Sequence, residues 1–340
     1  MIRLRSLALA LALGTSLLAS CDAGARSGAR TRTPDAATQA QAPLLERMRD
    51  AVDNVAHSGQ RRFETHVEKA GVDQVLAYTE FVRDRGDGCF SIDPLDLQSQ
   101  VDDPFLFLGL QRERQAFFRR YRDFQVRDVD LFLSNYLLRD LEQSGEVAGR
   151  SVSLLEATSR VDGRTYELSI DDETALVLAY SERRADGVLL TEMSYETFEL
   201  AAGEVKCFTN SIEEEALQLR GDLKAQLGFE VWSPALVPDG YAPYSAARIR
   251  DPRGFDWFKL VFTDGVETLF FLQQSPGDPV EIERALLEAG APAGATDDRV
   301  LVHEVGSLSV VQGSLSSREV MAVGKVASRD LLQLLDSARR

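Results

Sequence analysis

Short segments of alternating apolar and polar residues follow one another along most of the chain. Phe63, Thr65 and Val67 fall on one face of a predicted strand, and their neighbours on the other face are polar. A period of two is typical of a strand with one buried face. Similar segments predict further strands over the ranges 74–83, 89–92, 150–160, 165–170, 175–184, 188–200, 246–250, 257–263, 267–272, 300–305, 307–312 and 320–326.

Helical spacing occurs in fewer segments. Leu45, Met48 and Val52 recur at helical intervals, and Ser58 and Gly59 end that pattern. Further helices are predicted over the ranges 105–122, 129–143, 210–228, 279–289 and 329–338. Ser328 is expected to cap the last of them. Because helices and strands are interspersed without regular βαβ alternation, we expect an α+β fold with antiparallel sheets in two domains, 43–227 and 228–340.

The N-terminal residues follow the pattern of a secretion signal. Arg3 and Arg5 precede an apolar run over residues 6–20, which is shorter than the roughly 20 residues needed to span a bilayer. The run ends in Leu-Ala-Ser-Cys21, which resembles the lipobox of bacterial lipoprotein precursors. We therefore expect residues 1–20 to be a cleaved signal peptide and Cys21 to carry lipid. The alternative is an ordinary signal with a chance cysteine.

Residues 21–42 contain mostly small and polar residues without apolar periodicity, which predicts a flexible linker. Asp22 directly follows Cys21 and resembles an inner-membrane retention signal. These features predict a periplasmic protein that is attached to a membrane only through its N-terminal lipid, with the inner membrane favoured.

The composition disfavours several classes of partner and reaction. Without residues 1–20 the chain carries 36 basic and 54 acidic side chains, a formal charge of −18, which repels nucleic acid and anionic headgroups. The histidines at 57, 66 and 303 form no metal-ligand spacing, and the chain contains no GxSxG, P-loop or GxGxxG motif. The acidic run at 171–173 is typical of a solvated turn. We expect neither an enzyme nor a bound metal or cofactor.

Several motifs, taken in order, resemble a known family. The segments that carry the resemblance are 149–155, 166–171, 174–178, 234–241 and 260–265, together with glycines 306, 313 and 324. The first three resemble the central strands of LolA-like folds. The others resemble the small domain of the RseB/MucB family, periplasmic regulators of envelope-stress sigma factors. The resemblance implies a LolA-like antiparallel half-barrel sheet with covering helices, followed by a smaller α+β domain. The lipobox departs from the family, because its well-known members are soluble.

The LolA-like resemblance implies a hydrophobic cavity on the concave face of the large sheet. The residues expected to line it are Phe63, Val67, Tyr166, Leu168, Ile170, Met193 and Tyr195. A cavity requires unfilled volume, so the alternative for the same residues is an ordinary packed core.

Basic and aromatic residues interleave in the predicted helix over 105–122. Arg114, Phe117, Phe118 and Tyr121 form a candidate surface for an acidic partner helix or a phosphate-bearing glycolipid. The alternative is an amphipathic helix with a solvated basic face.

Two cysteines remain if Cys21 carries lipid. Cys89 and Cys207 would lie in an oxidising compartment, where we expect them to form a disulfide. The alternative is a pair of buried free thiols.

Two classes of function fit these features. In the first, a regulatory protein binds the periplasmic segment of an anti-sigma factor with both domains and senses an acyl-chain lipid or lipoprotein in the cavity. In the second, a carrier or envelope assembly factor uses the same cavity to handle lipids or lipoproteins. A purely structural role is a third alternative.

Overall fold

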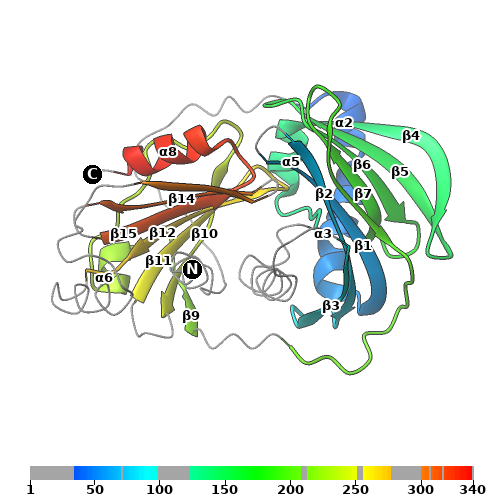
Figure 1. Cartoon of the computed structure of the whole chain (residues 1–340), viewed down its shortest axis with the longest axis horizontal. Helices are drawn as coiled ribbons and strands as arrows, with labels where there is room; N and C mark the ends of the chain where they lie inside the picture. Colours follow the sequence, from blue (N-terminus) through cyan, green and yellow to red (C-terminus); the bar gives the residue numbers. More distant parts are fainter. Residues whose placement is uncertain are drawn as a thin grey trace.

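The chain folds into two antiparallel sheets that lie side by side (Figure 1). The computed structural model describes residues 34–69, 72–98, 123–207, 213–250, 256–276, 300–305, 308–315 and 318–338. We call residues 34–207 the large-sheet domain and residues 213–338 the small-sheet domain. Sheets with few helices confirm the predicted α+β class.

The large sheet has eight strands in the order β3-β2-β1-β8-β7-β6-β5-β4. Their bounds are β1 (His57–Lys69), β2 (Val72–Asp84), β3 (Phe90–Gln98), β4 (Tyr136–Val147), β5 (Arg150–Ser159), β6 (Thr165–Asp171), β7 (Val177–Arg183) and β8 (Leu189–Tyr195). Pairing of β1 with β8 sets Phe63 opposite Met193. This one long-range pairing joins the N-terminal hairpin to the meander β4–β8, which makes the sheet continuous.

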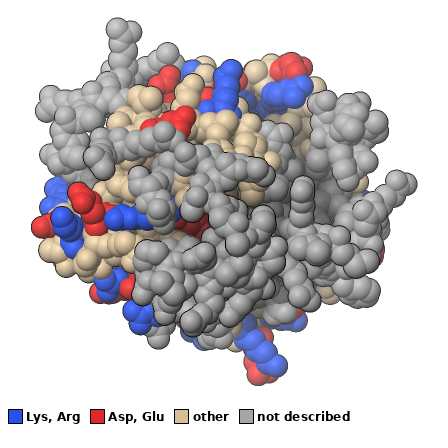
Figure 2. Space-filling view, turned by 60° about the vertical axis from the view of Figure 1, so that its left-hand side comes forward, with Lys and Arg blue, Asp and Glu red and all other residues tan. Residues whose placement is uncertain are grey.

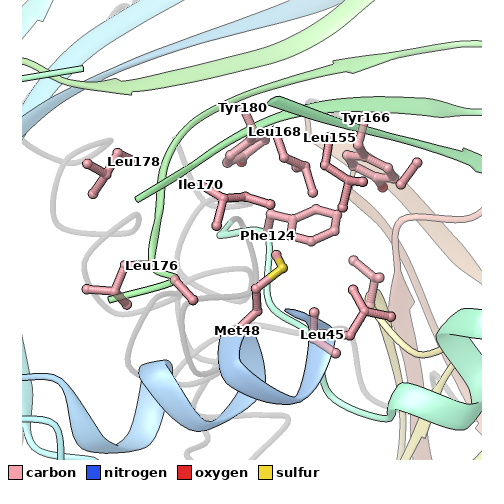
Figure 3. Close-up of a cluster of buried hydrophobic side chains, with 14 of the residues drawn as sticks. Leu45, Met48, Phe124, Leu155, Tyr166, Leu168, Ile170, Leu176, Leu178 and Tyr180 are labelled. Carbon is pink, nitrogen blue, oxygen red and sulfur yellow. The ribbon is translucent and has the colours of Figure 1, made fainter. Parts of the chain in front are cut away.

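One face of the large sheet is covered by helices and by an extended segment. Leu155, Ala157 and Ser159 of β5 are buried in alternation, as expected for a sheet with one covered face. The covering elements are α2 (Ala36–Ala40), α3 (Ala42–Asn54), α5 (Val129–Asn135) and the segment 123–126. Leu45 and Met48 of α3 point from below towards Phe124, and the strand residues close over it (Figure 3).

The small sheet has seven strands in the order β13-β14-β15-β12-β11-β10-β9. Its elements are β9 (Glu213–Ala216), α6 (Leu223–Leu227), β10 (Ala242–Arg250), β11 (Asp256–Thr263), β12 (Thr268–Gln274), β13 (Leu301–Val305), β14 (Leu308–Leu315), β15 (Arg318–Gly324) and α8 (Ser328–Ser337). Every residue of β12 is buried. Separate apolar clusters lie on the two faces, one including Leu331 of α8 and the other including Trp257.

Two predicted helices are wrong in extent. The helix predicted over 129–143 ends at Asn135, and the chain continues as β4, where Tyr136 and Leu138 are buried and Leu137 is exposed. Pairing with β5 favours the extended conformation there.

The helix predicted over 210–228 is also wrong, because residues 213–216 form β9 and only residues 223–227 are helical. Ala216 pairs with Ala247 of β10, so the small sheet begins before residue 228. Ser328 is the first residue of α8, not its cap. The helices predicted over 105–122 and 279–289 lie outside the described residues.

Candidate functional site: the covered sheet face and the domain interface

The residues predicted to line a cavity lie on the covered face of the large sheet. Six of them are at most 4% exposed and belong to one apolar cluster: Phe63, Tyr166, Leu168, Ile170, Met193 and Tyr195. Val67 lies in β1, but its side chain is outside the described set. The Phe124 ring fills the space in front of Leu168 and Ile170 (Figure 3).

A small cavity remains between α3, the segment 123–126 and the sheet. Its volume is about 30 Å³, which is room for a water molecule and much less than an acyl chain needs. Met48, Phe124 and Met193 form apolar walls, while Arg61 and Asp123 contribute charge. An acyl chain would therefore fit this particular cavity only if a lining side chain moved.

A buried ion cluster fixes the start of the covering segment. The Arg61 guanidinium contacts the Glu80 carboxylate at 2.6 Å and the Asp123 carboxylate at 3.0 Å. Burial alone would lower the pKa of Arg61, but the charges of Asp123 and Glu80 outweigh it and raise that pKa. The guanidinium therefore stays charged and ties residue 123 to β1.

His57 is held by neighbours within the same domain. Its Nδ1 lies 3.0 Å from the Val55 carbonyl oxygen, and its Nε2 lies 3.3 Å from the Tyr195 hydroxyl. The ring also stacks on Phe198. These contacts hold the His57 ring in place within the large-sheet domain.

The domain interface is centred on the turn between β11 and β12. The Gly265 carbonyl oxygen accepts hydrogen bonds from the backbone N–H groups of Arg127, at 2.8 Å, and Asp128, at 3.3 Å. Gly265 has φ +110°, and an added Cβ would lie 2.4 Å from the backbone nitrogen of Phe132. Only glycine combines this conformation with this close approach of two backbones.

A second set of contacts comes from the end of α5. The side-chain Nδ2 of Asn135 donates to the carbonyl oxygens of Gly240 and Asp264, each at 2.8 Å. Gly240 also has a positive φ, of +84°. The Asp-Gly pairs at 239–240 and 264–265 belong to the motifs that carry the family resemblance, and they lie at the domain interface. The sequence motifs alone did not indicate that these pairs lie between the domains.

Two buried tyrosines of the large-sheet domain donate hydrogen bonds to carboxylates of the small-sheet domain. The Tyr136 hydroxyl lies 2.7 Å from Asp264 Oδ2, and the Tyr166 hydroxyl lies 2.8 Å from Glu267 Oε1. Burial and, next, the charge of Glu267 raise the pKa of Asp264 to about 6. Burial also raises the pKa of Glu267, but Lys325 and Arg164 outweigh it, and the pKa of Glu267 is lowered.

Two ion pairs meet beside these tyrosines. Within the large-sheet domain Arg164 contacts Glu182 at 3.0 Å, and within the small-sheet domain Lys325 contacts Glu267 at 2.8 Å. Across the interface Lys325 lies 3.3 Å from Glu182. Each domain thus contributes one cation and one anion, so each pair is neutral within its own domain. No sequence motif marks these four residues, because they come from four separate segments.

The other predicted site residues fall into two groups. Cys89 and Cys207 are joined by a disulfide, with their Cα atoms 5.1 Å apart. Cys21 and the basic aromatic residues Arg114, Phe117, Phe118 and Tyr121 lie outside the described residues.

Charges of opposite sign are interspersed on the surface. On the face drawn in Figure 2, described Lys and Arg side chains lie next to Asp and Glu side chains. The exposed pair of Arg184 and Asp186, at 2.7 Å, is one example. The described ranges contain no group of three or more His, Cys, Asp or Glu residues that could hold a metal ion. None of the helices in those ranges is long and apolar enough to cross a membrane.

Solved structures with a similar fold include MucB. The chain is 17% identical to a chain in the structure of the MucA/MucB complex of Pseudomonas aeruginosa, with 87% of this chain and 96% of that chain covered and a TM-score of 0.47. A crystal structure of MucB is 15% identical, with 88% of this chain and 97% of that chain covered and a TM-score of 0.45. A LolA superfamily protein from Nitrosomonas europaea is 9% identical, with 49% of this chain and 94% of that chain covered and a TM-score of 0.19. No family model and no curated protein matches the chain.

Proposed function

We propose that this chain is a periplasmic regulatory binding protein. It holds the periplasmic segment of an anti-sigma factor across both domains, and it releases that segment when an acyl-chain lipid or lipoprotein binds the large-sheet domain. The observation that carries the proposal is the chemistry of the domain interface. Apart from Val266, which packs against the large-sheet core, the side chains described there are polar or charged, whereas the cores of both domains are apolar.

Such an interface can open at modest cost. Arg164 and Glu182 remain paired with each other when the domains separate, and so do Lys325 and Glu267. Breaking a buried ion pair is costly mainly because it leaves a buried charge without a partner, and separation instead returns two neutral pairs to water. The docked and separated arrangements are therefore close enough in free energy for a ligand to shift their populations.

The disulfide limits how far the domains can move apart. Cys207 is fixed to Cys89, and Glu213 already belongs to the small sheet. The residues between Cys207 and Glu213 span at most about 20 Å when fully extended. The domains therefore change their relative placement while remaining neighbours, as a switch that must reset requires.

Protection from proteolysis tests this function directly. The full mature protein should slow cleavage of the periplasmic segment of an anti-sigma factor encoded beside it by a site-specific protease, and a lipid ligand should restore cleavage. Gly265→Ala, which obstructs docking of the domains, should reduce protection. Gly187→Ala is the matched control, because Gly187 also has a positive φ but nothing lies within 4 Å of an added Cβ. Equal cleavage with and without the protein would refute the regulatory assignment.

A carrier function is the second candidate. The apolar character of the covered face of the large sheet favours it, since the same residues would suit an acyl chain once Phe124 moved. A carrier would take a fluorescent fatty acid from donor vesicles and deliver it to acceptor vesicles without any anti-sigma segment. Transfer without protection would favour the carrier, and protection without transfer would favour the regulator.

Lipid attachment at Cys21 is part of both candidates. The processed protein should carry thioether-linked acyl chains and partition into detergent, and Cys21→Ser should abolish both properties. A mature N-terminus at another, unmodified residue would contradict the lipobox interpretation.

A further inference from the structure

Phe124 belongs to a continuous group of aromatic rings. Its ring centroid is 5.1 Å from that of Tyr166 and 5.9 Å from that of Phe132, both in edge-on geometry. Phe132 in turn contacts Tyr136 at 4.8 Å. The Phe124 side chain therefore touches one interface tyrosine directly and the other through a single intervening ring.

The same Phe124 side chain lines the small cavity under the sheet. It stands between Met48 of α3 and the strand residues Leu168 and Ile170 (Figure 3). Because the cavity is only about 30 Å³, a ligand with an acyl chain has to displace a lining side chain to enter. Phe124 lies on an extended segment and not on a sheet strand, so its side chain can move without disrupting the backbone pairing of the sheet.

Tyr136 and Tyr166 connect this aromatic group to the small-sheet domain. Their rings belong to the core of the large-sheet domain, while their hydroxyl groups donate to Glu267 and Asp264. Tyr166 is 1% exposed and Tyr136 is 2% exposed, so neither ring can turn without disturbing its neighbours. A shift of Phe124 therefore changes the position of a hydroxyl group at the interface.

We propose that Phe124 couples the cavity of the large-sheet domain to the domain interface. An acyl chain that enters the cavity displaces the Phe124 ring, Tyr166 loses its packing partner and its bond to Glu267, and the docked arrangement loses population to the separated one. This coupling rests on the proposed release by a lipid ligand, and it names the residues through which release occurs.

Amide hydrogen exchange on the full chain measures docking directly. The Arg127 and Asp128 amides donate across the interface to Gly265, whereas the Ser159 amide donates to Arg164 within the large-sheet domain. Dansyl-undecanoic acid, a fluorescent fatty acid, should raise exchange in peptides containing residues 127 and 128 about tenfold and leave the Ser159 amide unchanged. The radius of gyration from solution scattering should increase with it.

Tyr166→Phe keeps the ring and removes only the interface hydroxyl. It should raise exchange at residues 127 and 128 without any probe, and it should also tighten probe binding, because coupling between two equilibria is reciprocal. Tyr195→Phe is the control for docking, since its hydroxyl lies near His57 in the same domain. Wild-type exchange and wild-type probe affinity in Tyr166→Phe would overturn the coupling.

A second pair of variants separates this coupling from the lipid hypothesis. Phe124→Ala should increase the radius of gyration and the exchange at the interface more than Met48→Ala, which truncates another wall of the cavity. If no probe binds but Phe124→Ala still separates the domains, lipid sensing fails and the coupling stands. If Phe124→Ala and Met48→Ala give the same docking, the coupling fails whether or not the probe binds.

Discussion

The core of the large-sheet domain and the domain interface are both buried, yet they are built from opposite chemistry. Under the sheet, Leu45, Leu168 and Ile170 pack as apolar side chains that are at most 2% exposed. At the interface the buried groups include tyrosine hydroxyls, carboxylates and cations, next to the apolar side chain of Val266 that packs against the core of the large-sheet domain. Apolar burial stabilises roughly in proportion to the area removed from water, whereas buried charges depend on partners and geometry.

This difference in buried chemistry indicates which part of the molecule can change its arrangement. The apolar core loses stabilisation steeply when it is exposed to water, so it does not open without a ligand that covers the exposed apolar groups. The interface exchanges one set of polar partners for water while Arg164 keeps Glu182 and Lys325 keeps Glu267. Apart from Phe124, which we propose to couple the two regions, variants in the core should therefore act on unfolding, and variants at the interface should act on docking.

Loss of the disulfide should have the largest effect. The bridge between Cys89 and Cys207 closes a loop with a sequence separation of 118 residues, for which chain entropy predicts about 4–5 kcal/mol of stabilisation. The double variant Cys89→Ser, Cys207→Ser should lower the denaturant midpoint accordingly. Alkylation of denatured, unreduced protein provides the check on pairing, and two reactive thiols from these positions would contradict it.

Leu168→Ala tests the core side of the comparison. The variant leaves a cavity behind a fully buried side chain, which typically costs about 2–5 kcal/mol. Chemical denaturation should show this loss in the free energy of unfolding. Exchange at the Arg127 and Asp128 amides under native conditions should stay close to wild type, and selective opening of the interface would break the proposed separation between core and interface.

Gly265→Ala tests the interface side. Its φ of +110° and the close approach to Phe132 should destabilise the docked arrangement by about 1–3 kcal/mol. We expect faster exchange at the Arg127 amide and a larger radius of gyration, with the large-sheet domain still folded. Gly187→Ala should show only a small loss of stability and no change in docking, because an added Cβ there meets no atom within 4 Å.

A dependence of docking on pH should be the smallest effect. The pKa of Asp264 is raised to about 6 when it is buried, so the docked state takes up a proton that an exposed Asp264 releases. This contribution is fully present below the ordinary pKa of aspartate and is lost as the pH rises through about 6. Between pH 7 and pH 5.5 docking should strengthen by about 1 kcal/mol, as read from interface exchange corrected for intrinsic rates.

The groups that face Asp264 define the control for this titration. After burial, the charge of Glu267 raises the pKa of Asp264, whereas the hydrogen bond from Tyr136 lowers it. Tyr241 also faces Asp264, whose charge raises the pKa of that tyrosine. Asp264→Asn removes the titrating carboxyl and should remove the dependence between pH 7 and pH 5.5. Below this range Glu267, whose pKa is lowered, loses its charge and docking should weaken again. A dependence that persists in Asp264→Asn would assign it to another group.

Much of the fold could be predicted from the sequence because its determinants are local. Alternation in the segments 150–160 and 165–170 reflects one covered face, and β5 and β6 follow it closely. The helical spacing of Leu45 and Met48 likewise reflects the face of α3 that the sheet covers. The residues expected around a cavity were placed on one buried face, but whether that face is hollow depends on Phe124, which lies far away in the sequence.

Only the tertiary structure decided the rest. The chain leaves helix at Tyr136 because β5 pairs with it, and residues 213–216 are extended because β10 pairs with them, in spite of local helix signals. The meeting of Arg164, Glu182, Glu267 and Lys325 has no local signature, since four segments contribute one residue each. Local patterns fix which side chains are buried along an element, whereas the partners of a buried charge depend on how distant elements pack.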